Sequence, residues 1–133
     1  MAVFAAISVG VARELGASSA ERNAAIDVVR DQVRGDARAV VRRIAGCRRE
    51  AACAARIRAQ VASLRTTAPL RVVRYDGLGG RSGVARIVWK AGARLPTVQC
   101  VRLRRVGDVA SGYRIDVLDL SAPIARQASC PGR

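Results

Sequence analysis

The chain has 133 residues, of which 50% are apolar and 26% charged, and this balance excludes a disordered or low-complexity protein. Its length fits one domain with its own hydrophobic core. The 24 basic residues are 23 arginines and a single lysine, Lys90, and with 10 acidic residues they give a formal net charge of +14, so attraction to polyanions is expected. Histidine is absent, which excludes His-based triads and His-ligated metal sites.

Residues 1–18 form an apolar N-terminal segment. Residues 2–12 are an unbroken run of apolar and small residues, followed at once by Arg13 and Glu14. The run is too short to cross a bilayer, which takes about 20 residues. Two interpretations stay open: the run is the end of a longer signal or membrane anchor, or it is an apolar first helix packed on the core.

Residues 19–64 have the periodicity of three helices. The first is expected to begin after an N-cap serine at position 18 or 19 and to end at Gly35. Asp36 is expected to cap a second, shorter helix that runs to about residue 45. Apolar residues at helical spacing predict a third helix over residues 50–64.

After residue 69 the composition becomes that of a β-rich half. Four strands are expected, over residues 70–75, 84–90, 97–106 and 113–121. Short turns that contain glycine separate them, and such turns favour antiparallel hairpins over parallel crossovers. The sequence therefore predicts an α+β fold, in which about three N-terminal helices pack on a curved, cone-like, four-stranded antiparallel meander sheet. One domain would occupy residues 19–122, followed by a C-terminal tail, residues 123–133.

The four cysteines are an even set without a C-x-x-C motif, so zinc and thioredoxin-type chemistry are poor interpretations. Of the three possible disulfide connectivities, the sequence favours Cys47 with Cys53, which are close in sequence, and Cys100 with Cys130, which would tie back the C-terminal tail. This pairing predicts an extracytoplasmic protein, secreted or membrane-anchored. The alternative is buried, reduced thiols in a cytosolic protein.

A resemblance adds to this picture. The helix junction Val33-Arg34-Gly35-Asp36, within residues 24–46, and the long strands after it resemble the nuclear-transport-factor-two-like superfamily, also described as SnoaL-like or cystatin-like cone proteins. The likeness covers roughly residues 20–122. It implies a sheet that wraps its own helices, and many small exported or membrane-anchored bacterial members of the superfamily are not catalysts.

The same superfamily includes isomerases and epoxide hydrolases, which would need proton-transfer groups inside the cone. Here the candidates are Asp116 and Asp119 on the last strand, near Tyr113. The two aspartates have opposite strand parity, so at most one is expected to face a pocket. Cross-strand ion pairs with Arg102 and Arg114 are the simpler interpretation. We expect no catalytic residue, no cofactor and no metal.

Arginines on the expected strands would form a basic sheet surface if the strand registers align them. The alternative is a solvated arginine face, because few aromatic side chains are present to stack on nucleic-acid bases. Trp89 alternates with small and apolar residues and is expected in the core. The residues assigned to the basic surface are Arg71, Arg74, Arg86, Arg102, Arg104 and Arg114.

These features predict a non-enzymatic extracytoplasmic binding or assembly module of a high-GC bacterium, tethered to a membrane through its N-terminus in one arrangement. Its partner would be an anionic surface or polymer, or a protein. Three alternatives stay open: a cytosolic arginine-rich nucleic-acid-binding protein, a small isomerase or hydrolase of the cone fold, and a pilin-like subunit. An apolar N-terminal helix, a four-stranded meander and a C-terminal disulfide loop favour the pilin-like alternative. The shortness of the apolar run, the polar break at Arg13-Glu14 and the additional helices oppose it.

Overall fold

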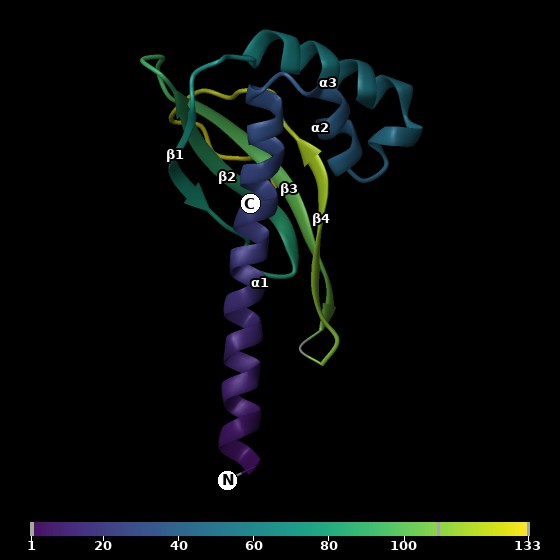
Figure 1. Cartoon of the computed structure of the whole chain (residues 1–133), viewed down its shortest axis with the longest axis vertical. Coiled ribbons are helices and arrows are strands. Elements are labelled where there is room, and N and C mark those ends of the chain that lie inside the picture. Colours follow the sequence, from purple (N-terminus) through teal and green to yellow (C-terminus); the bar gives the residue numbers. More distant parts are fainter. Residues whose placement is uncertain (1, 109, 133) are drawn as a thin grey trace.

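A computed structural model describes residues 2–108 and 110–132 of the chain. Three α-helices and a short 3₁₀-helix precede four antiparallel strands, which follow one another in the order β1-β2-β3-β4. The sheet is curved and is not closed into a barrel (Figure 1), so the predicted α+β class is confirmed. The elements are α1 (Ala2–Val33), α2 (Ala37–Arg43), η1 (Cys47–Arg49), α3 (Ala51–Leu64), β1 (Leu70–Asp76), β2 (Ser82–Ala91), β3 (Thr97–Asp108) and β4 (Gly112–Leu120).

Helix α1 is one continuous helix of 32 residues, about 48 Å long at 1.5 Å per residue. The expected helix start at the serines is wrong: Ser18 and Ser19 lie in the middle of α1. A serine caps a helix only where the preceding chain is not helical, and here alanine-rich sequence without proline continues the helix on both sides. The C-terminal half of α1 lies against the sheet, whereas the N-terminal half projects beyond it (Figure 1). Within the described residues, no helix is long and apolar enough to span a bilayer.

The hydrophobic core fills the space between α1 and the concave face of the sheet. Val28 and Val29 of α1 are fully buried, as are Ile87 of β2 and Leu103 of β3. Trp89 is 4% exposed, which confirms its predicted place in the core. Because core residues alternate with exposed arginines along β3, the opposite face of the sheet is the polar one.

Helices α2 and α3, together with η1, form a unit that we call the helical cap. The Asp36 carboxylate accepts a hydrogen bond from the backbone N–H of Ala39 (3.0 Å), so its predicted N-cap role is confirmed. Gly46 turns the chain with a φ of +81°, and a disulfide between Cys47 and Cys53 ties the corner to α3. The helical cap lies at the end of the body opposite to the projecting half of α1 (Figure 1).

Candidate functional site

The strand registers place all six predicted arginines on the outer sheet face, which is the face turned away from α1. A β-bulge at Val73 makes this possible on β1, because Arg71 and Arg74 are three residues apart and would otherwise face opposite sides. Arg71 stands opposite Lys90, and Arg102 stands opposite Val84. The six residues on this face are Arg71, Arg74, Arg86, Arg102, Arg104 and Arg114.

Two carboxylates form ion pairs with three of these arginines. The Arg74 guanidinium donates to Asp76 (3.1 Å), and Arg104 and Arg114 both donate to Asp116 (3.0 and 3.2 Å). The hydrogen bond from Arg104, supported by Arg114, holds the pKa of Asp116 below its ordinary value. Asp116 is therefore a charged acceptor at neutral pH, and its two arginines already have an anionic partner.

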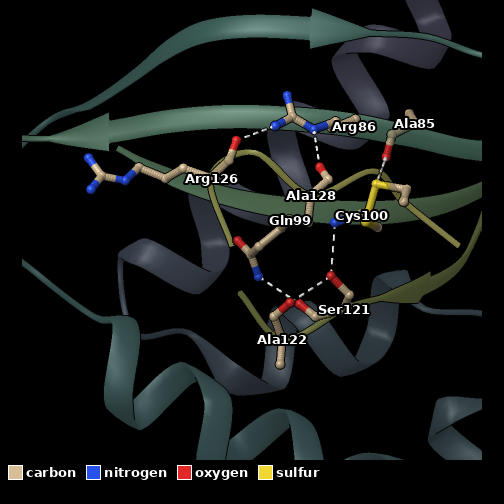
Figure 2. Close-up of a disulfide and its surroundings, with 9 residues drawn as sticks. Ala85, Arg86, Gln99, Cys100, Ser121, Ala122, Arg126 and Ala128 are labelled. Atoms are coloured by element: carbon tan, nitrogen blue, oxygen red, sulfur yellow. Dashed lines mark hydrogen bonds between the residues drawn. A yellow bond between two sulfur atoms is a disulfide. The ribbon is translucent and has the colours of Figure 1, made fainter. Parts of the chain in front are cut away.

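The C-terminal tail occupies a fourth arginine. Figure 2 shows the Arg86 guanidinium donating to the backbone carbonyls of Arg126 (2.7 Å) and Ala128 (3.1 Å). The Cys100–Cys130 disulfide holds the same tail against β3. Of the predicted surface, only Arg71 and Arg102 make no side-chain hydrogen bond or ion pair with a residue that the structure describes. The outer sheet face is thus a poorer anion-binding surface than its arginine content indicates.

Both predicted disulfides are confirmed. The Cα atoms are 5.2 Å apart in Cys47–Cys53 and 5.7 Å apart in Cys100–Cys130, and no cysteine of the chain is free. The second disulfide ties the tail back to the sheet as expected. Two disulfides in a chain of this size indicate an oxidising, extracytoplasmic environment.

The acidic residues of β4 are engaged in ion pairs. The expectation that Asp116 and Asp119 face opposite sides of the sheet is wrong, because a bulge at Leu118 places Asp119 opposite Arg102. The Asp119 carboxylate accepts a hydrogen bond from Arg56 of α3 (2.6 Å). Neither aspartate lines the hollow at Tyr113, which has a volume of about 280 Å³. The structure does not gather the three candidate residues at one hollow.

A polar cluster that the sequence analysis missed joins α1 to the sheet. The Glu21 side chain is 3% exposed and accepts hydrogen bonds from the Tyr75 hydroxyl (2.6 Å), the Leu78 backbone N–H (3.0 Å) and Arg105 (2.8 Å). Burial, and then the hydrogen bond to Glu21, raise the pKa of Tyr75 above its ordinary value. A signal was present, because Glu21 lies four residues before Ala25 on the apolar face of the helix.

A second set of residues that was missed is the arginines of the helical cap. Residues 37–65 contain eight arginines and one acidic residue, Glu50. Arg43 pairs with Asp31, and Arg56 pairs with Asp119. The other six are exposed and make no side-chain hydrogen bond or ion pair with any residue in the described part of the chain. They are Arg38, Arg42, Arg48, Arg49, Arg58 and Arg65.

Neither a metal-binding cluster nor a comparison with known proteins assigns a function to this chain. Within residues 2–108 and 110–132, no group of three or more cysteines and carboxylates could hold a metal ion. No family model, no curated protein and no solved structure matches the chain. The resemblance to the nuclear-transport-factor-two-like superfamily therefore stays a prediction.

Proposed function

We propose that this chain is a non-enzymatic, extracytoplasmic assembly module, a pilin-like subunit that docks through the projecting half of α1. The observation that carries the proposal is the continuity of α1. Residues 17–33 pack against the sheet, and the apolar residues 2–12 continue the same helix away from the body (Figure 1). The body would hold the projecting segment rigidly and present it to a partner.

The contacts of α1 with the body support a rigid attachment. Ala17 is 3% exposed and Ala25 is fully buried, so the helix is closely packed on the body from its midpoint onward. The hydrogen bonds and ion pair of Glu21 then fix the rotation of α1 relative to the sheet, since three separate donors converge on one carboxylate. A helix held in this way cannot turn freely about its axis.

Two of the three sequence features that oppose the pilin-like interpretation do not oppose it in the fold. Arg13 and Glu14 lie within α1 and do not interrupt it. The additional helices α2 and α3 belong to the helical cap, at the opposite end from the projecting segment (Figure 1). Neither feature obstructs docking along residues 2–12.

We commit to a second copy of this chain as the partner of the projecting segment. Burying apolar surface contributes about 25 cal/mol per Å², so equivalent apolar segments laid side by side would stabilise one another. The net charge of +14 opposes this association at low ionic strength. Assembly is therefore expected to strengthen when salt screens the repulsion between bodies.

Sedimentation velocity of the full chain, over a concentration series at low and high salt, tests this proposal. Ala5→Glu with Ala12→Glu places two charges seven residues apart on the projecting segment and should leave only monomer. The matched control is Ala52→Glu with Ala59→Glu, which makes the same change at two exposed positions of α3 and should assemble normally. A wild-type chain that stays monomeric at all concentrations and salt levels would contradict the proposal, as would equal loss of assembly in both variants.

A further inference from the structure

The helical cap carries exposed positive charge that nothing within the described chain neutralises. We use the name cap arginines for five residues on α2, the corner and α3. Only Glu50 contributes negative charge among residues 37–65, whereas the arginines of the outer sheet face share Asp76, Asp116 and the carbonyls of the tail. The cap arginines are Arg38, Arg42, Arg48, Arg49 and Arg58.

The fold fixes the directions of these side chains. Ala39 and Val40 of α2 are buried, so Arg38 and Arg42, four residues apart, share the outward face of that helix. Arg48 and Arg49 lie on the 3₁₀ turn that begins at Cys47, one of the two disulfide-bonded cysteines of the corner. They line a hollow of about 400 Å³ together with Ala45 and Gly46. The corner therefore presents its two guanidinium groups from a constrained backbone.

We propose that the cap arginines bind the phosphate backbone of double-stranded nucleic acid. The planar fork of arginine matches a phosphate with two parallel hydrogen bonds, which the point charge of lysine does not. Residues 37–65 contain no aromatic side chain on which an unpaired base could stack. The exposed neighbours of Arg58 on α3 include Ala55, Ala59 and Ala62, whose side chains are small, so a backbone can approach closely. The surface thus fits a duplex, recognised through its charge and shape.

The position of the helical cap decides against a lipid surface as the partner. The helical cap lies at the end of the body opposite to the projecting apolar segment (Figure 1), so a bilayer that held the segment would not meet the cap arginines. Duplex nucleic acid carries about one charge per 1.7 Å of its axis, and release of its condensed counterions drives binding to clustered arginines. The inference rests on the charges of the helical cap and is independent of the proposed assembly.

Fluorescence anisotropy with a labelled mixed-sequence DNA duplex of about 20 base pairs tests this site over a salt series. The test variant combines Arg38→Gln, Arg42→Gln, Arg48→Gln and Arg49→Gln in the full chain. The matched control removes the same charge from the outer sheet face, with Arg71→Gln, Arg74→Gln, Arg102→Gln and Arg114→Gln. Circular dichroism and intact mass under non-reducing conditions establish that each variant is folded with both disulfides.

We expect the test variant to bind the duplex at least tenfold more weakly. The magnitude of the slope of log K against log salt should fall by about 3.6, since each of the four lost phosphate contacts removes about 0.9. In the control variant the slope should fall by less than half of that amount. Equal losses in the two variants would mean that the overall charge is responsible and would overturn the site. Tighter binding of the corresponding single strand, or equal binding of polygalacturonate, a carboxylate polymer, would overturn the assignment to a duplex.

Discussion

The Glu21 carboxylate of α1 accepts a 2.6 Å hydrogen bond from the Tyr75 hydroxyl of β1, across 54 residues of sequence. Arg105 of β3 and the backbone N–H of Leu78 donate to the same carboxylate. The three donors come from β1, from the turn after it and from β3. One buried acid on α1 therefore determines how the long helix is seated on the sheet.

Replacement of Glu21 should be among the most damaging single changes in the body. Glu21→Gln removes the ion pair between Glu21 and the Arg105 guanidinium, whose side chain is 14% exposed. Breaking a buried ion pair from one side lowers the free energy of unfolding by about 3–5 kcal/mol. Urea denaturation followed by circular dichroism measures this loss. As a control, Asp27→Asn removes the exposed pair with Arg30 and should cost less than about 1 kcal/mol. Similar losses for the two variants would contradict the role assigned to Glu21.

The same cluster predicts a fall in stability at alkaline pH. Burial and the hydrogen bond to Glu21 raise the pKa of Tyr75 above its ordinary value of 10.0. Above about pH 10 the unfolded chain loses this phenolic proton while the folded chain retains it, so the free energy of unfolding decreases as pH rises. Urea midpoints measured between about pH 8 and pH 11 should fall more steeply for the wild type than for Tyr75→Phe. Parallel pH profiles for the two proteins would show that Tyr75 is not responsible.

The Gln99 side chain is at the centre of a buried hydrogen-bond network. The Gln99 side chain, on a fully buried residue, exchanges two hydrogen bonds with the Gln32 amide (2.8 and 2.9 Å). It also accepts from the Trp89 indole N–H and donates to the Ser121 carbonyl, both at 2.8 Å. Gln99→Leu removes the acceptor of the Gln32 amide NH₂ and of the Trp89 indole N–H, whereas Gln60 still donates to the Gln32 side-chain oxygen and to the Ser121 carbonyl. Each buried group left unsatisfied costs about 1–3 kcal/mol. We expect a loss of about 3 kcal/mol or more in denaturant unfolding monitored by Trp89 fluorescence. The control Gln127→Leu, at an exposed position, should change little.

The two disulfides should contribute unequally. Cys100 and Cys130 are 30 residues apart, whereas Cys47 and Cys53 are 6 apart. The stabilisation grows with the length of the closed loop. Removing Cys100–Cys130 should therefore cost about 3–4 kcal/mol, and removing Cys47–Cys53 about 2 kcal/mol. Paired Cys→Ser variants, compared by denaturant unfolding, measure the difference. Limited proteolysis should also cleave the tail of the Cys100→Ser, Cys130→Ser protein first. The reverse order of stability would contradict the loop-length argument.

Local sequence patterns predicted most of the secondary structure. The four strands lie within two residues of their expected bounds, and α3 within one, because alternation, helical spacing and glycine turns act over a few neighbouring residues. The predicted start of the first helix was wrong by about 17 residues. Ser18 and Ser19 have the chemistry of an N-cap, but a cap needs a non-helical residue before it, and none precedes them here.

The candidate sites show the same difference between local sequence patterns and tertiary contacts. The sequence alone determined the α+β class and the excess of arginine, since both depend on composition or spacing. It favoured one of three pairings of the cysteines, which the structure confirms. Only the tertiary structure decided which arginines have partners. Bulges at Val73 and Leu118 reset which residues share a sheet face, and the returning tail covers Arg86. Among the described residues, only two carboxylates, Asp31 and Asp119, form ion pairs with arginines of the helical cap, and its remaining arginines stay exposed. Whether a charge is available depends on contacts between distant segments, and neighbouring residues do not encode those contacts.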